Sequence, residues 1–298
     1  MLQKAANRQA LTFILPALIA MLLVHIIPIM WGIYISFIDL DIKTLAQGTK
    51  APFAGFKNYI EIFTSGLEIG EKFLRSIWNI CFYGLVVIPA GFIISLAVAL
   101  LFNQNFAGRT LVRGLILLPY ITPEAVMYNV WRFIFQARIG IVNKYLLALG
   151  LIKEPLIWLV GDRAMSAIIV ASIWKGWPFS ALVLLAGLQN IPVELYEAAR
   201  IDGANWFQRF RYVTLPMLWP VCRTLLIISM IWNFHAFNQF YVMLGADTSA
   251  RVAVPSLVIH REAFTSLHYG LGSAMAVIML LVVFVLTFMS IITRKEEA

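Results

Sequence analysis

Charged side chains are scarce in this chain. They make up 13% of its 298 residues, whereas 61% of the residues are hydrophobic. Soluble domains average about 25% charged residues. The composition therefore excludes an ordinary soluble protein and indicates a chain that is embedded in a lipid bilayer. The net charge of +8 comes from Arg and Lys residues dispersed over polar segments. That dispersal fits membrane orientation, and it predicts no nucleic-acid partner.

Cysteine and histidine are also rare. Cys81 and Cys222 lie in separate apolar runs, with no CxxC spacing and no histidine cluster nearby. We therefore expect both to be buried packing residues and not metal ligands. The four histidines, at positions 25, 235, 260 and 268, have no paired spacing, and we expect them to serve packing or interfaces.

The motifs of nucleotide and hydrolytic sites are absent from the sequence. There is no Gly-Lys pair, and therefore no GxxxxGK[ST] phosphate loop, and there is no HExxH or GxSxG. We expect the chain to be no enzyme, with no nucleotide site, metal or other cofactor of its own.

Long apolar runs are what the sequence does contain. A membrane helix needs about 20 mostly apolar residues. Six stretches qualify, at 11–37, 77–102, 115–135, 165–189, 217–244 and 272–293. They predict an all-α integral membrane protein in which residues 1–298 form a single transmembrane domain. The first run is longer than a signal-peptide core and has no cleavage pattern behind it, so we expect it to be a retained anchor.

Six spans would place both termini on one side of the membrane. If that side is the cytoplasm, its loops and ends hold ten basic residues in roughly 55 positions, against eleven in roughly 95 positions outside. This bias favours cytoplasmic termini. Three long segments would then lie outside, and the first and the last of them contain a candidate short helix, within 53–63 and within 254–264.

A polar island at 191–216 joins the fourth and fifth spans. Pro192 suits the start of a helix and Gly203 suits the residue just beyond its end. The alternative is a helix that rests on lipid headgroups, but such helices usually carry lysines. This island has three acidic residues and no lysine. The pattern favours a short helix that docks into another protein.

Four charged residues fall inside the predicted spans, where charge is costly, and one of them, Arg223, lies near the start of its span. Glu124 either faces a cavity or forms a structural salt bridge. Lys175, in the segment SIWKGWPF, either lines a sugar path among aromatic rings or anchors at the outer interface. Arg132 is expected to reach the outer headgroups.

The polar island resembles the EAA loop of the inner-membrane permeases of binding-protein-dependent ABC importers. The likeness is closest to the carbohydrate branch, the maltose- and trehalose-type permeases, and segments such as FAGFKNYIEIF and HYGLGSAMAVIML extend it over nearly the whole chain. The matching pattern, which the resemblance implies is the coupling site, is Glu197, Ala198 and Ala199, then Asp202, Gly203 and Ala204, with Leu215-Pro216 at the far end.

The resemblance implies a division of labour among several proteins. A separate ATP-binding subunit dimer would hold ATP and Mg and would receive the coupling helix. A second homologous permease would complete the membrane pathway, and an extracytoplasmic solute-binding protein would deliver a sugar or sugar derivative. The chain would lie in a bacterial or archaeal plasma membrane and would work by alternating access.

The resemblance also implies sugar-lining positions on the spans before and after the loop. Lys175 stands where the family has an apolar residue, and Phe179 stands where it has a tyrosine. Together with Glu124, the predicted substrate path comprises Ser172, Lys175, Gly176, Phe179, Ser229, Trp232 and Asn233.

Three other functions remain open from the sequence. A permease for glycerol-3-phosphate or another polyol phosphate would use Lys175 as its cation. An ion-coupled secondary transporter would need its own ion site and no docking helix. An intramembrane enzyme would need a nucleophile and base at helical spacing within the spans, and the sequence shows none.

Overall fold

The computed structural model describes residues 2–64, 68–246 and 249–295. These residues form helices and the segments that connect them, with one antiparallel bridge between Ile38 and Phe53. The predicted all-α fold class is confirmed. The chain divides into two compact units, Met1–Phe73 with Val258–Val282 and Leu74–Leu257 with Val283–Ala298.

Within the described residues, five helical segments are long and apolar enough to cross a membrane. They are Thr12–Ile35, α4 (Glu68–Phe102), α9 (Arg163–Gln189), Trp206–Phe234 and, within α15 (Tyr269–Lys295), Tyr269–Ser290. The first combines α1 (Leu2–Met21), the π-helical turn η1 (Leu22–Ile26) and α2 (Ile27–Ile35). The fourth combines α11 (Trp206–Arg209), the π-helical turn η3 (Phe210–Thr214) and α12 (Leu215–Phe234).

The predicted third span, 115–135, is not one straight helix. It is a bent pair in which α5 (Arg109–Ile116) and α6 (Leu118–Ile121) lead into α7 (Glu124–Ile134) at 88°. The break lies at Thr122 and Pro123, whose ψ angles of 131° and 132° are extended. A residue before proline avoids the helical region, and proline has no N–H to continue the helix.

The predicted fifth span, 217–244, was too long at its C-terminal end. Helix α12 ends at Phe234, and α13 (Asn238–Leu244) follows as a separate helix. Buried Ala236, Phe240 and Met243 pack into the core beside α4, α7 and α9. Packing of these side chains accounts for the change of direction, since no proline or glycine stands at the break.

The two short helices predicted within 53–63 and 254–264 are confirmed; the first lies in the unit of Met1–Phe73 with Val258–Val282, and the second crosses the boundary at Leu257 between the two units. They are α3 (Lys57–Phe63) and α14 (Pro255–His260), the latter continued by the π-helical turn η4 (Arg261–Thr265). Buried Asn58 donates to the carbonyls of Ser36 and Ile38 at 2.9 and 3.1 Å. These bonds fix α3 against the end of the first span. The Asp39 carboxylate, 2.7 Å away, raises the pKa of Lys57. A 3-10 turn, η2 (Leu45–Lys50), lies in the same outer segment.

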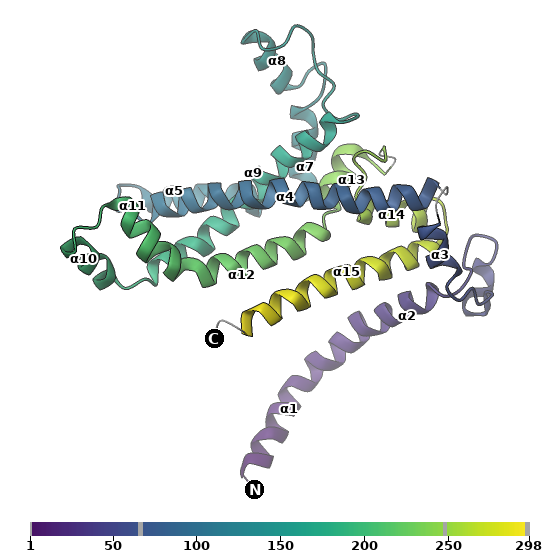
Figure 1. Cartoon of the computed structure of the whole chain (residues 1–298). Coiled ribbons are helices and arrows are strands. Elements are labelled where there is room, and N and C mark those ends of the chain that lie inside the picture. The colour runs from purple at the N-terminus through teal and green to yellow at the C-terminus, as the bar shows by residue number, and fades with distance from the viewer. Residues whose placement is uncertain (1, 65–67, 247–248, 296–298) are drawn as a thin grey trace. The chain divides into compact units, whose positions relative to one another are not determined.

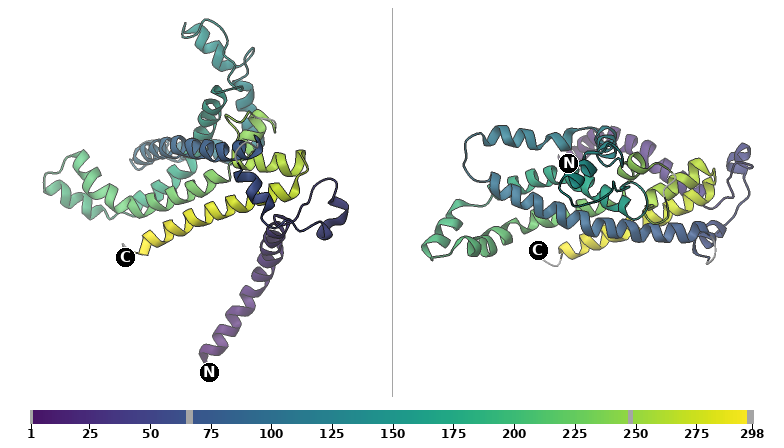
Figure 2. Two further views of the ribbon diagram at one scale, coloured as in Figure 1. Left: turned by 45° about the vertical axis from the view of Figure 1, so that its right-hand side comes forward. Right: turned by 90° about the horizontal axis from the view of Figure 1, so that it is seen from above.

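In the other unit, α4, α9 and α12 run side by side (Figures 1 and 2). A buried cluster that includes Ala99, Leu184 and Leu218 joins the three helices. Helix α8 (Ile141–Ala148) projects beyond α7 (Figure 1). Cys222 is buried in the cluster, as expected, but Cys81 is exposed on α4, so the prediction for Cys81 was wrong. Its side chain faces away from the core of the unit.

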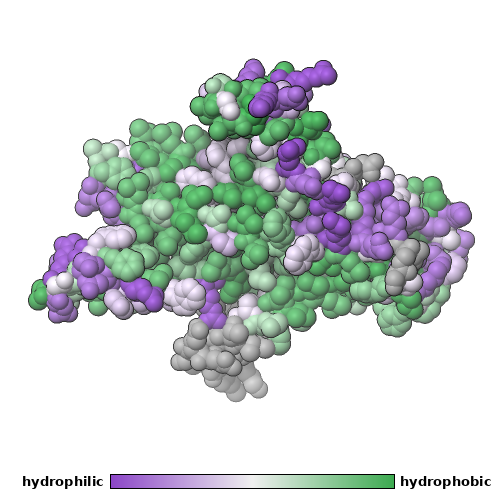
Figure 3. All heavy atoms as spheres, turned by 45° about the horizontal axis from the view of Figure 1, so that its top comes forward, coloured by the Kyte–Doolittle hydropathy of each residue, from purple (hydrophilic) through white to green (hydrophobic). Residues whose placement is uncertain are grey.

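Much of the surface is apolar. The window that defines the first span has no buried residue, and hydrophobic residues cover much of the face seen in Figure 3. Exposed apolar surface on this scale marks contact with lipid or with another protein.

Candidate functional site

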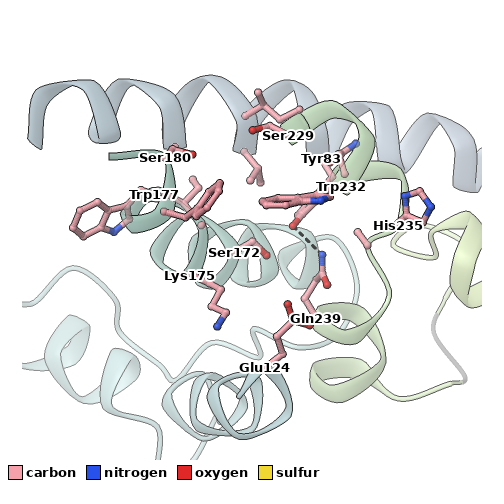
Figure 4. Close-up of a pocket in the computed structure, with 18 of the residues that line it drawn as sticks. Tyr83, Glu124, Ser172, Lys175, Trp177, Ser180, Ser229, Trp232, His235 and Gln239 are labelled. Carbon is pink, nitrogen blue, oxygen red and sulfur yellow. Dashed lines mark hydrogen bonds between the residues drawn. The ribbon is translucent and has the colours of Figure 1, made fainter. Parts of the chain in front are cut away.

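One cavity lies within the unit of α4, α9 and α12, with a volume of about 460 Å³. Its walls come from these three helices, from α13 and from the break between α6 and α7 (Figure 4). This volume falls in the range of roughly 300–1,000 Å³ typical of small-molecule sites. The polar and aromatic side chains that line it are Tyr83, Phe92, Tyr120, Glu124, Tyr128, Ser172, Lys175, Trp177, Phe179, Ser180, Ser229, Trp232, Asn233, His235, Phe237, Asn238 and Gln239.

Three aromatic rings form a continuous row along the cavity. Tyr120 stacks on Phe179 with ring centroids 5.2 Å apart, and Phe179 lies 5.5 Å from Trp232. The three rings come from α6, α9 and α12. Such a row offers flat apolar faces beside polar groups, which suits a ligand that has both.

Lys175 contacts the break in the third span. Its Nζ donates to the carbonyls of Pro119, Tyr120 and Thr122 at 3.1, 2.7 and 2.7 Å. The last carbonyls of a helix have no partner within that helix, and a lysine can satisfy them. Lys175 therefore stabilises the end of the α5–α6 segment from the neighbouring helix.

Glu124 is the first residue of α7, directly after the break. A carboxylate is favourable at a helix N-terminus because of the helix dipole. Its Oε2 accepts from Asn238 Nδ2 at 2.6 Å, and the side chain is exposed within the cavity. Glu124 thus joins α7 to α13 while remaining open to a ligand.

Asn233 is buried at the wall between α4 and α12. Its Nδ2 donates to the carbonyl of Ile80 at 3.1 Å, and this fixes the orientation of the amide because a carbonyl only accepts. Among the described residues, its buried Oδ1 has no hydrogen-bond partner. A Cβ added at Gly84 would lie 2.5 Å from Asn233 Nδ2, so glycine at 84 makes this close approach possible.

Further neutral groups complete the lining. Gln239 Nε2 donates to the Tyr83 hydroxyl at 3.2 Å, and Ser172 lies close to the hydroxyls of Tyr83 and Tyr128. The Nδ1 of His235 lies 2.8 Å from the carbonyl of Ile231. In the neutral ring, Nδ1 then carries the proton and Nε2 is an acceptor. The cavity is therefore rich in hydroxyl, amide and imidazole groups.

The second candidate region is α10 (Val193–Ile201) with the turn that follows it. Pro192 is the residue before the helix and not its first residue. Gly203 has φ of +78°. Its N–H bonds to the Arg200 carbonyl at 3.0 Å, and the N–H of Ala204 bonds to the Ala199 carbonyl at 2.9 Å. This pair of bonds is the Schellman motif, which favours glycine in the left-handed position.

The turn leads into the next helix through a capping box. The Asn205 side chain accepts from the Gln208 N–H, and the Gln208 side chain accepts from the Asn205 N–H. The surface formed by α10 and its turn is exposed at Glu197, Ala198, Asp202 and Gly203, and half-buried at Ala199 and Ala204. A rigid, slim knob thus stands between α9 and α11 (Figure 1).

Residues 88–294 match the family described as "Binding-protein-dependent transport system inner membrane component". This match covers well over half of the chain. The chain belongs to this family.

The permease has relatives that cover most of its length. It is 33% identical over 266 residues to the "Trehalose/maltose transport system permease protein MalF" of Thermococcus litoralis, covering 89% of this chain and 86% of the relative. It is 34% identical over 271 residues to the "Sulfoquinovosyl glycerol transport system permease protein SmoG" of Agrobacterium fabrum, covering 91% and 85%. The resemblance to carbohydrate-branch permeases is therefore confirmed.

A solved structure shares the fold. It is described as a bacterial ABC transporter involved in the import of the acidic polysaccharide alginate, and its matching chain has a TM-score of 0.83 with this permease at 24% identity. The match covers 99% of the permease and 98% of that chain. The permease therefore has the fold of an ABC importer membrane subunit.

In the permease, all eight residues predicted for the substrate path line the one cavity. They are Glu124, Ser172, Lys175, Gly176, Phe179, Ser229, Trp232 and Asn233. Glu124 is the first residue of α7, and Lys175 Nζ lies among carbonyls of the broken third span. Whether these residues meet a transported molecule stays a prediction, as does the coupling role of the six residues around α10.

The sequence analysis did not select several residues that line the cavity. Tyr83, Tyr128, His235, Asn238 and Gln239 were not singled out as lining residues. The signal was present in the segment NFHAFNQF, where four polar residues interrupt a predicted span. Polar residues at membrane depth usually face the interior of a bundle.

Proposed function

We propose that this permease carries a sugar or sugar derivative across the plasma membrane of a bacterium or archaeon by alternating access. The observation that supports this most is the cavity, which combines the row of Tyr120, Phe179 and Trp232 with neutral hydrogen-bonding groups. Pyranose rings present apolar C–H faces and a rim of hydroxyls. The aromatic rings of the lining can pack on the C–H faces, and its neutral polar groups can hydrogen-bond to the hydroxyls.

The names of the relatives support a carbohydrate but no single compound. One relative is named for trehalose and maltose, and another for sulfoquinovosyl glycerol. We propose only the class for this permease, since those names belong to the relatives.

We propose that ATP hydrolysis takes place in a separate subunit dimer that binds ATP and Mg. The sequence has no phosphate loop of its own, and the exposed knob at α10 has the size and shape of a docking element. Glu197 and Asp202 would meet basic groups on the partner, while the small residues Ala198 and Gly203 would allow close approach. The knob and both termini would then be cytoplasmic.

We propose two further partners. A second homologous permease would cover exposed apolar helix surface, and an extracytoplasmic solute-binding protein would deliver the sugar, in keeping with the name of the family. An ion-coupled secondary transporter would need no docking helix, so that alternative leaves the exposed, capped knob at α10 without a role.

The test is purification of the tagged chain from its native membrane in mild detergent, followed by assay of ATP hydrolysis and identification of associated subunits. We expect ATPase activity together with an ATP-binding subunit and a second multi-span permease. A chain that elutes alone without ATPase activity, and that supports uptake dependent on a proton or sodium gradient, would contradict the proposal.

A further inference from the structure

The cavity contains one cation and one carboxylate, and the two groups differ in how many of their hydrogen bonds are already made within the protein. Of the described residues that line it, Glu124 is the one with a carboxylate and Lys175 the one with an ammonium group. Figure 4 shows Lys175 and Glu124 on the same side of the cavity.

The Lys175 ammonium group is occupied by the protein. An ammonium has three N–H donors and no acceptor. Its three carbonyl partners, on Pro119, Tyr120 and Thr122, lie at 2.7–3.1 Å. A phosphate or carboxylate that bound Lys175 would have to displace at least one of these bonds and leave a helix-end carbonyl unsatisfied.

The Glu124 carboxylate, in contrast, has hydrogen-bonding capacity left for a ligand. One oxygen accepts from Asn238 at 2.6 Å, while the side chain remains exposed to the cavity. A carboxylate only accepts hydrogen bonds, so it suits sugar hydroxyls and repels anions. The neutral acceptor Oδ1 of Asn233, elsewhere in the cavity lining, adds no anion-binding donor.

We propose that the cavity of this permease selects glycans without negative charge, with Glu124 as the excluding group and Lys175 as a positioning residue for the broken span. This inference rests on the proposed sugar-transport function and names its substrate class. It argues against glycerol-3-phosphate, sugar phosphates and uronic acids as substrates. At an effective dielectric constant of about 20, like charges about 6 Å apart repel strongly enough to weaken binding by roughly a hundredfold, and attraction to the nearby Lys175 ammonium group offsets part of this.

The test is direct binding to the complete purified importer in lipid nanodiscs, without the solute-binding protein, so that only the membrane subunits choose the ligand. The probes are pairs of a neutral sugar and an anionic derivative that keeps both rings closed: trehalose with trehalose 6-phosphate, maltose with maltose 6′-phosphate, and cellobiose with cellobiouronate. We expect at least one neutral sugar to bind, with its anionic counterpart at least about tenfold weaker.

The variant Glu124→Gln sharpens the test, because glutamine keeps an acceptor for Asn238 but removes the charge. We expect the affinity for the anionic member, divided by the affinity for its neutral counterpart, to rise roughly tenfold, because the change removes the negative charge that only the anionic member meets. Equal or tighter binding of the anionic member by the unaltered importer would overturn the inference and leave the sugar function intact. Failure of every pair to bind would contradict the sugar function itself, and the inference with it.

The role of Lys175 is tested separately by hydrogen exchange across residues 115–135. Lys175→Met should increase exchange in this segment, and Lys175→Arg should restore protection because a guanidinium also donates to several carbonyls. Unchanged exchange in Lys175→Met, together with loss of binding of an anionic probe, would show that Lys175 is an anion ligand and would overturn the proposal.

Discussion

The cavity and the knob at α10 are built in different ways, although both were indicated by the sequence. The knob is local: its helix, its Schellman turn and its capping box lie within Val193–Gln208. The cavity gathers side chains from Tyr83 to Gln239, held by bonds such as Asn233 to Ile80. A local motif can be read from spacing alone, whereas the cavity exists only once α4, α9, α12 and α13 pack together.

The two regions are joined by two helices. From Gly176 to Gln189, α9 runs thirteen residues toward the knob, about 20 Å at 1.5 Å per residue. Helix α12 returns from the other side of the knob to Ser229. Movement of the knob would therefore reach the cavity through rigid helices. Variants in each region should separate coupling from binding.

The largest effect is expected for Gly203→Leu in the knob. A side chain at φ of +78° is strained by roughly 1–2 kcal/mol, and it adds bulk to the proposed docking surface. We expect ATP-driven uptake to fall more than about tenfold, while membrane insertion and direct sugar binding remain. Uptake by purified importer in proteoliposomes measures this.

Gly150→Leu is the matched control. Gly150 follows the end of α8 and has φ of +69°. It forms the same Schellman motif: its N–H donates to the Leu147 carbonyl, and the N–H of Leu151 donates to the Leu146 carbonyl. No side chain or backbone atom lies within 4 Å of a Cβ added at either glycine. The strain is thus alike, and equal loss of uptake in both variants would remove the coupling role from Gly203.

The next largest effect is expected for Asn233→Ala in the cavity. The change removes the Ile80 bond and the acceptor Oδ1, and loss of a buried hydrogen-bond partner costs about 1–3 kcal/mol. We expect the half-saturating sugar concentration to rise between about fivefold and a hundredfold. The ATP-binding subunit should remain associated.

Asn79→Ala serves as its control. Asn79 is equally buried in α4 and donates to the carbonyls of Ala250 and Ala253, but it does not line the cavity. Its loss should lower thermal stability without changing the half-saturating concentration. The same shift in sugar affinity for both variants would show that Asn233 acts only through folding.

A smaller effect is expected for Trp232→Ala. The ring is half exposed at 54% and ends the aromatic row. Loss of an aromatic contact costs about 0.5–1.5 kcal/mol beyond its buried area, which weakens binding two- to tenfold. Trp78→Ala is the control, since Trp78 is exposed on α4 away from the cavity. A weaker effect for Trp232 than for Trp78 would contradict a sugar contact.

The smallest effect is expected for Gly176→Ala. An added Cβ there meets no atom within 4 Å, and alanine in a helix is favoured over glycine by roughly 0.5–1 kcal/mol. We expect thermal stability to stay level or rise, while the half-saturating concentration shifts by no more than about threefold. A large loss of stability would show that Gly176 serves packing and not the cavity.

Much of the fold could be predicted because membrane helices are long and apolar. The sequence missed the sharp bend at Thr122-Pro123, although Pro123 carried the signal, because a proline within a span permits either a mild kink or a full break. The end of α12 at Phe234 had no local signal, since the segment His235–Phe237 contains no helix breaker. That break depends on how Phe240 and Met243 pack.

The cavity shows the same limit. Family motifs marked six of its residues on α9 and α12, and intramembrane charge marked Glu124 and Lys175. Neither the motifs nor the charge could reveal that Lys175 donates hydrogen bonds to three carbonyls outside its own helix, because those carbonyls belong to residues more than 50 positions away in the chain.

The most direct test of the account measures uptake of radiolabelled sugars by the complete importer in proteoliposomes, with and without internal ATP, for the unaltered chain, Gly203→Leu and Asn233→Ala. The account predicts ATP-dependent uptake, lost in Gly203→Leu at every sugar concentration and recovered in Asn233→Ala when the sugar concentration is raised. Uptake that proceeds without ATP, or that responds in the same way to both variants, would contradict it.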